Sequence, residues 1–397
     1  MSWLFVLGAL TAFAPMAIDM YLPVLPQIAR ELQATPAQTQ MTLAACFLGF
    51  ACGQLLYGPV ADRYGRKPPL YVGVTVFVLA SIGCALAVSI DWLIALRFLQ
   101  ALGGCAGIVI TRAIVRDRFA ATEAARLFSL LMLVMGLAPI LAPLVGGWLL
   151  HWVGWRAIFV VLALFGLVCG VTAWRVLEET LPVTARQSLH PRALLAAFAA
   201  VLCEREFYGH TLAGGFAQAG MFAYITSASF VFIDYFAVPA EYFGWIFGGN
   251  ATGLIAMSQL NRRLLRQHST GTVLRVGSHV ALVFGALLLV AACWRNAPIW
   301  AIALPLFGFI ASIGITAPNA SANALAPFAQ RAGTASALLG TLQFSFAAIA
   351  ASVVSSLPGK LMPARGPLAM ATVIFTCTLL AWLANQLLLR PAKIDPR

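Results

Sequence analysis

Twelve long apolar stretches, each close to the length of a membrane-spanning helix, limit what this sequence can fold into. They lie at about 3–28, 39–60, 69–88, 92–113, 126–149, 155–175, 207–236, 243–261, 273–293, 298–318, 333–357 and 367–389. About 20 apolar residues cross a bilayer as a helix, whereas a β-barrel shows short alternating segments. Only 10% of the residues are charged, against about 25% in soluble domains. The sequence therefore predicts an all-α integral membrane protein with twelve transmembrane helices, and excludes a soluble enzyme.

The basic residues predict the orientation of these helices. With the N-terminus inside, the cytoplasmic segments hold 19 Lys and Arg residues and the outer segments hold 5, while Arg97 lies within a stretch. Cytoplasmic loops are enriched in Lys and Arg, so both termini are expected in the cytoplasm. The same distribution explains the net charge of +12 without a nucleic-acid partner. No basic residue precedes the first stretch, which we interpret as a retained helix and not as a cleaved signal peptide.

One polar segment divides the twelve stretches into six and six. It spans residues 176–205 and predicts a cytoplasmic central loop between a half at 1–175 and a half at 206–397. Two six-helix halves indicate an internal duplication, as in many transporters. Within the loop, Arg192–Cys203 is apolar enough for a short helix on the membrane surface. A plain tether explains this segment equally well.

Two ionisable residues of the first half, Asp19 and Arg97, lie within apolar stretches. Charge inside a bilayer is costly and usually marks a functional site. Counted from the outer ends of their helices, they lie roughly 13 Å and 9 Å deep, so an acid and a base could face one another. The functional interpretation is a proton site with a basic partner. The alternative is a permanent ion pair that only fixes the packing of two helices.

Two further patterns are a charged turn and an apolar stretch that contains prolines. The turn at 58–67 places one acid and three bases around Gly65, while the stretch at 126–149 contains Pro139, Pro143 and the pair Gly146-Gly147. Proline removes a backbone hydrogen bond and lets a helix bend.

The sequence lacks a Walker motif, a catalytic serine or zinc motif and clustered His or Cys residues. We therefore expect no enzymatic activity, no metal, no cofactor and no drive by ATP.

Several motifs resemble the major facilitator superfamily. GPVADRYGRK at 58–67 resembles its motif A, and ALRFLQALGG at 95–104 resembles motif B, with Arg97 as the basic residue. GLAPILAPLVGG at 136–147 resembles motif C, the antiporter motif, although Ala142 replaces a glycine. DMYLP at 19–23, GWRAIF at 154–159, SFVFI at 229–233 and FGWIF at 243–247 are similar to the Bcr/CflA branch of drug:proton antiporters.

This resemblance implies a fold, a mechanism and residue roles. It implies two pseudo-symmetric six-helix halves that export small amphipathic drugs, of the multidrug, phenicol or bicyclomycin type, in exchange for protons by alternating access in a bacterial inner membrane. Proton coupling is expected at Asp19 and Arg97. The resemblance also implies a cytoplasmic gate, with Asp117 as a partner of Arg66, at Gly58, Asp62, Arg63, Gly65 and Arg66. The antiporter motif comprises Gly136, Pro143, Gly146 and Gly147.

The expected substrate cavity lies near the midplane between the halves. Its candidate walls are Tyr21, Met132, Met135, Tyr224, Phe247, Asn250 and Phe344, although core packing or contact with lipid explains each of them equally well. The expected partners are a small-molecule drug, protons and the lipid bilayer, and we expect a monomer. Two alternatives stay open: a proton-coupled importer of a sugar or organic acid, and a membrane receptor without transport activity.

Overall fold

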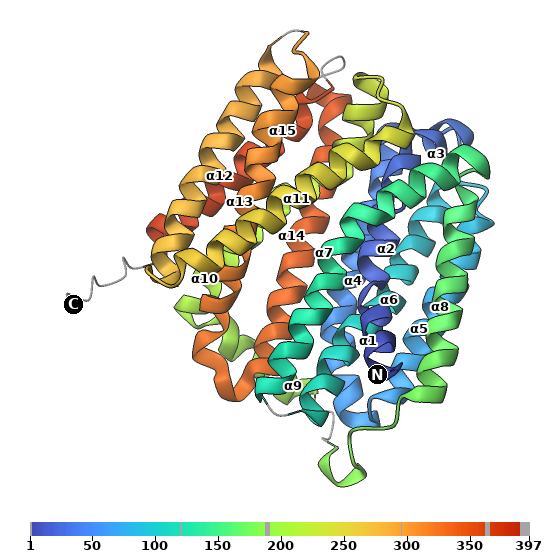
Figure 1. Ribbon diagram of the computed structural model, residues 1–397, viewed down its shortest axis with the longest axis vertical. Helices are drawn as coiled ribbons and strands as arrows, with labels where there is room; N and C mark the ends of the chain where they lie inside the picture. Colours follow the sequence, from blue (N-terminus) through green and yellow to red (C-terminus); the bar gives the residue numbers. More distant parts are fainter. Residues whose placement is uncertain (1, 120, 187–190, 295, 362–365, 390–397) are drawn as a thin grey trace. The chain divides into compact units, whose positions relative to one another are not determined.

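The structure is a computed structural model that describes residues 2–119, 121–186, 191–294, 296–361 and 366–389. Within these ranges the regular secondary structure is helical and no strand occurs, as predicted (Figure 1). Eleven helices of the described chain are long and apolar enough to cross a membrane. The stretch predicted at 243–261 forms α11 (Ala240–Leu264), which has 25 residues but falls outside this set of eleven.

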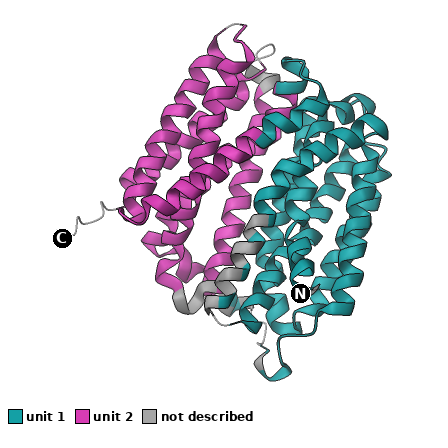
Figure 2. Ribbon diagram, viewed as in Figure 1, with its two compact units in different colours: residues 1–194, 232–248 teal, residues 195–231, 249–397 magenta. Residues whose placement is uncertain are grey.

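The described chain forms two compact units, shown in different colours in Figure 2. Unit 1 comprises Met1–Leu194 and Phe232–Gly248, and unit 2 comprises Leu195–Val231 and Gly249–Arg397. The boundaries expected from the central loop thus differ from these units, because residues 232–248 group with the first half. The division of the chain into two six-helix halves stays a prediction from the sequence.

Unit 1 contains the first six predicted spans. Its α6 packs against both α4 and α5, and α5 packs against α8. The helices of this unit are α1 (Ser2–Thr11), α2 (Phe13–Asp19), η1 (Leu22–Val24), α3 (Leu25–Glu31), α4 (Pro36–Tyr64), α5 (Lys67–Ala85), α6 (Ile90–Arg118), α7 (Ala121–Trp152), α8 (Arg156–Val176) and the short turn η2 (Val183–Ala185).

Unit 2 is centred on α10, which packs against α13, α14 and α15, while α12 packs against α13 and α15. The remaining helices of the chain are α9 (Pro191–Leu202), α10 (Arg205–Ser229), the π-helical turn η3 (Phe230–Tyr235), α11, α12 (Thr270–Cys293), α13 (Ile299–Leu325), η4 (Ala326–Arg331), α14 (Ala332–Leu361) and α15 (Leu368–Leu387).

Local sequence signals explain where several spans begin and end. The side chain of Thr35 accepts the backbone N–H of Gln38, whose own side chain accepts the backbone N–H of Thr35, so a capping box starts α4. The hydroxyl groups of Ser89 and Ser269 cap α6 and α12 by accepting a backbone N–H from the first turn of each helix. Gly65 ends α4 with a φ of 94°, which favours glycine because it has no Cβ.

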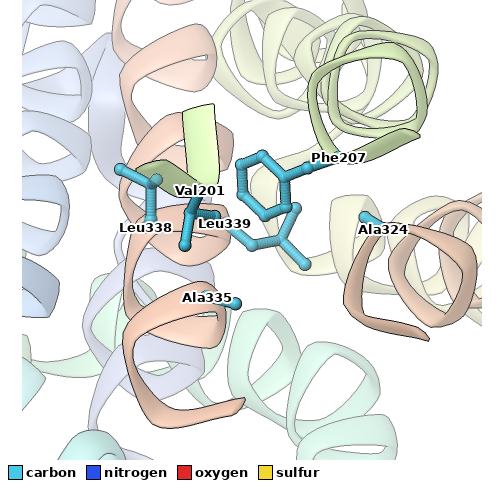
Figure 3. Packing of buried hydrophobic residues seen from close by; sticks show 6 residues of the cluster. All are labelled: Val201, Phe207, Ala324, Ala335, Leu338 and Leu339. Atoms are coloured by element: carbon cyan, nitrogen blue, oxygen red, sulfur yellow. The ribbon is translucent and has the colours of Figure 1, made fainter. Parts of the chain in front are cut away.

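The short helix considered within the central loop is present as α9. Some of its side chains are exposed, as in a helix that lies on a surface, but others are buried. Leu195 is exposed, but Val201 is fully buried. Figure 3 shows Val201 in a cluster of buried apolar side chains with Phe207, Ala324, Ala335, Leu338 and Leu339. Because this cluster joins α9 to α10, α13 and α14, the end of the loop is part of the core of unit 2.

Candidate functional site

The first membrane span is divided into four successive helical segments, whereas the sequence analysis expected one continuous helix. It consists of α1, α2, η1 and α3, and Asp19 is the last residue of α2. Pro23 and Pro26 are the second residues of η1 and α3. Proline has no backbone N–H, so neither residue can continue the hydrogen-bond ladder of the preceding helix. The DMYLP segment therefore places an acidic side chain at a discontinuity within the bilayer.

Asp19 is buried, with only 4% of its surface exposed, and it is the one buried acid in the part of the chain that the structure describes. Burying a carboxylate is costly unless the group is paired or neutral. The ion pairs within 4.0 Å among the described residues do not include Asp19. A carboxyl group in this setting can exchange a proton at a lower cost than a carboxylate that is locked in an ion pair.

Arg97 on α6 is fully buried, but it does not form the ion pair with Asp19 that the sequence analysis considered. Its Nη2 donates to the carbonyl oxygen of Ala17 at 2.9 Å, and its Nη1 donates to Gln100. The guanidinium lies over the ring of Tyr21, 4.4 Å from the centroid. Arg97 therefore holds the residues on either side of the break, and among the described residues it forms no ion pair with Asp19 within 4.0 Å.

Partners on α4 and α5 fix the residues that hold Arg97. The hydroxyl groups of Tyr21 and Thr42 are 2.9 Å apart, and the side-chain amide of Gln100 donates to the hydroxyl of Ser81 at 2.7 Å. Tyr21 is fully buried in these contacts. These contacts hold Tyr21 beside the break, and its place in the wall of a substrate cavity stays a prediction.

Two glycines allow neighbouring helices to approach the breaks of the first span. An added Cβ at Gly107 of α6 would meet the carbonyl oxygen of Leu10, and one at Gly146 of α7 would collide with the carbonyl oxygen of Met20. Within the same motif, Pro143 is buried in α7, and a Cβ at Gly147 would lie 3.0 Å from the carbonyl oxygen of Ala240. Gly146 of the antiporter motif therefore packs against Met20, the residue that follows Asp19.

This packing predicts that Gly146→Ala severely reduces transport. The methyl group would push α7 away from Met20, and overpacking of this kind costs about 1–3 kcal/mol. Gly249→Ala is the matched control, because a Cβ at Gly249 meets nothing within 4 Å. Initial rates of drug export in membrane vesicles, normalised to protein amount, provide the measurement. Equal rates for the two variants would show that close packing at the break is dispensable.

A network of charges surrounds the turn between α4 and α5. Arg66 donates from Nε to Asp117 at 2.7 Å and from Nη1 to Asp62 at 2.6 Å. Burial acts to lower the pKa of Arg66, but the two carboxylates outweigh it, so that the pKa lies above its usual value. Arg63 is exposed and lies over the ring of Tyr64, and a Cβ at Gly58 would meet nothing within 4 Å. A gating role for these residues stays a prediction.

Glu179 is a member of this network that the sequence analysis missed. Its carboxylate accepts the backbone N–H groups of Arg66 at 2.8 Å and Lys67 at 3.0 Å, which lie at the start of α5. The next residue, Thr180, donates its hydroxyl to Asp117 at 3.0 Å. Because a helix N-terminus attracts negative charge, Glu179 fastens the beginning of the central loop to the motif A turn. In the sequence, the acidic pair at 178–179 was the only feature that could have pointed to this contact.

Glu179→Gln should lower the free energy of unfolding at neutral pH by about 1 kcal/mol, after allowance for solvent screening. Burial acts to raise the pKa of Glu179, but the N–H groups of Arg66, Leu181 and Lys67 outweigh it, so that the pKa lies below its ordinary value of 4.5. The carboxylate therefore stabilises the fold above pH 4.5, and this contribution is lost as the pH falls through the lowered value.

The measurement is the melting temperature of detergent-purified protein between pH 7 and pH 3.5, with Glu178→Gln as control. Glu178 is exposed and lies 3.6 Å from Arg118, so its loss should change little. The difference between wild type and Glu179→Gln should shrink as the pH falls. A difference that is independent of pH, or equal effects of the two substitutions, would contradict the assigned role of Glu179.

The remaining candidates for a substrate cavity belong to both units. In unit 2, the amide of Asn250 donates to the hydroxyl of Tyr224 at 2.9 Å, and the ring of Phe344 lies 5.9 Å from that of Phe222. Phe247 is buried against Phe243 in unit 1. Met135 and Gly136 are half-buried in α7, whereas the side chain of Met132 lies outside the described residues. The role of these residues in substrate binding stays a prediction.

Comparison with known proteins gives the class of this protein. Residues 7–352 match the family model of the Major Facilitator Superfamily. The chain is 34% identical over 351 residues to a bicyclomycin resistance protein homolog of Haemophilus influenzae, covering 88% of each chain. It is 30% identical over 328 residues to a chloramphenicol resistance protein of Pseudomonas aeruginosa, covering 82% of this chain and 77% of the relative.

A comparison of structures shows the same fold. The structure of a D-xylose-proton symporter matches with a TM-score of 0.74 at 13% identity, over 96% of this chain and 97% of that one. The chain belongs to the Major Facilitator Superfamily and is a multi-pass membrane protein of a transporter family. The resemblance to the resistance-protein branch, seen in the sequence motifs, is confirmed by the relatives.

Proposed function

We propose that this protein exports small amphipathic drugs across a bacterial inner membrane in exchange for protons. The observation that carries the proposal is the buried, unpaired Asp19 at the break of the first span, in a chain whose relatives are named as resistance proteins. An export pump driven by a proton gradient needs a group that binds a proton from one side and releases it to the other. Asp19 is the described acid whose burial suits this task.

In this mechanism the residues around Asp19 hold the break of the first span in position. Arg97 holds Ala17 and Tyr21, and Gly146 lets α7 contact Met20. Movement of α7 against the break during alternating access would change the environment of the carboxyl group. A change in environment alters the balance between its charged and neutral forms, which couples a proton to the transport cycle.

The charge network at the other end of unit 1 supports a second role. Arg66 is held by Asp62 and Asp117, and Glu179 binds the start of α5. We assign these residues to the cytoplasmic gate, where charged hydrogen bonds can favour one conformation of the cycle. The distribution of the basic residues supports this orientation, with the network and both termini in the cytoplasm. We expect the transporter to act as a monomer, with no cofactor besides the proton gradient.

The function is tested by growth of a bacterial host that lacks its own drug pumps. Expression of the protein should raise the inhibitory concentration of at least one neutral antibiotic, such as a phenicol or bicyclomycin, in a panel of toxic compounds. A proton uncoupler should remove the accompanying fall in cellular drug content. Unchanged sensitivity to the whole panel, with the protein present in the membrane, would contradict drug export.

A further inference from the structure

An apolar groove of about 490 Å³ lies in unit 2, among α11, α12 and α13. Its walls are formed by aliphatic and aromatic side chains, among them Met257, Leu264, Val276, Val280, Phe307 and Ile315. Val276 is 59% exposed and Phe307 is 43% exposed, so the groove opens to the surface of the helices. The volume is in the range of sites that hold small apolar ligands.

The length of the groove matches one leaflet of a bilayer. Along α12 its lining extends from Thr272, two residues after the helix begins, to Phe284. Twelve residues of α-helix are about 18 Å long, and half of the hydrocarbon core is about 15 Å thick. The groove therefore begins at one face of the membrane and ends near the middle, as an acyl chain of a phospholipid does.

The end of the groove at the membrane face is basic. His268 lines it in the turn between α11 and α12, and the exposed residues Arg262, Arg263 and Arg266 lie within six positions of it. The ion pairs found within 4.0 Å in the described chain do not include these arginines. Between Glu241 and Asp395 the sequence contains no acidic residue at all. Among the described residues, no carboxylate therefore pairs with the arginines of this turn within 4.0 Å.

We propose that the groove binds one anionic phospholipid of the cytoplasmic leaflet. An acyl chain fills the groove, and the phosphate of the headgroup lies at Arg263, Arg266 and His268. The basic residues that set the orientation place this turn on the cytoplasmic side, where basic clusters attract anionic lipids. A neutral drug carries no charge that would bind the basic end, and a free phosphate ion would make no favourable contact with the apolar walls. The proposal goes beyond drug export and does not depend on it.

The test is native mass spectrometry of the purified full-length protein, with phosphatidylglycerol and phosphatidylcholine of identical acyl chains. Wild-type protein should retain one phosphatidylglycerol in preference to phosphatidylcholine. Arg263→Gln with Arg266→Gln should weaken phosphatidylglycerol binding roughly 30-fold, because each basic residue contributes about 1 kcal/mol. The control pair is Arg116→Gln with Arg175→Gln, which removes the same charge from exposed positions elsewhere on the chain.

A second pair of variants tests the groove itself. Val276→Trp fills it from the open side and should remove the retained lipid. Val290→Trp places the same ring on α12 at a residue that is 70% exposed and lies outside the lining. Melting temperatures confirm that all variants are folded. Equal retention of the two lipids by wild type, unchanged binding in the Arg263/Arg266 variant, or equal binding by the two tryptophan variants would each overturn the proposal.

Discussion

Replacing Asp19 with asparagine should abolish export driven by a pH gradient while leaving the protein folded. Asparagine keeps the shape of the side chain but cannot bind and release a proton. The side chain is buried, and the described ion pairs do not include it, so the substitution breaks no pairing of charges. Drug transport into everted membrane vesicles, started by acidifying their lumen, should fall to the level of vesicles that lack the protein.

Asp91→Asn is the matched control for this experiment. Asp91 is exposed in the first turn of α6, so its loss should leave transport near that of wild type. Binding of the drug to purified protein should survive in both variants, which separates a coupling defect from misfolding. Normal resistance in cells together with normal dependence on the pH gradient in Asp19→Asn would rule out Asp19 as the proton site.

Arg97→Ala should abolish export and also destabilise the protein. Removing the guanidinium leaves the carbonyl of Ala17 and the side-chain oxygen of Gln100 without their donor. Each buried acceptor left unsatisfied costs about 1–3 kcal/mol. Arg97→Lys keeps the charge but loses the planar fork that both donates to Ala17 and lies over Tyr21, so we expect partial activity at best.

Melting temperatures and transport rates of both variants, compared with Arg116→Ala, provide the measurement. Arg116 lies on the same helix but is exposed, so its loss should have little effect. A stable Arg97→Ala protein with normal turnover would contradict the role of Arg97 at the helix break. A protein that is fully stable but inactive would instead show that Arg97 serves transport and is not needed for folding.

Hydropathy predicted the helices well because a membrane span needs an apolar run of fixed length. Each predicted stretch became a long helix or a broken one, with ends shifted by a few residues. The break in the first span was not predicted, although Pro23 and Pro26 signal it, because the whole run is apolar. A hydropathy pattern reports burial in lipid and not the continuity of backbone hydrogen bonds.

The site was harder to predict because it depends on the direction in which each side chain points from its helix. Counting residues placed Asp19 and Arg97 at similar depth, but each residue turns an α-helix by about 100°, so depth alone does not make two side chains face each other. Arg97 in fact contacts Ala17 and Tyr21. Glu179 lies 113 residues from Arg66 in the sequence, and only the folded chain brings its carboxylate to the start of α5.

The central claim, exchange of drug for protons through Asp19, is tested most directly by proton movement in liposomes that contain the purified protein. A pH-sensitive dye is enclosed, the pH is made equal on both sides, and a neutral drug such as chloramphenicol is added outside. Entry of the drug by exchange should drive protons out and make the lumen more alkaline, with no change for Asp19→Asn. Acidification of the lumen would indicate proton-coupled import, and drug entry without proton movement would contradict coupling.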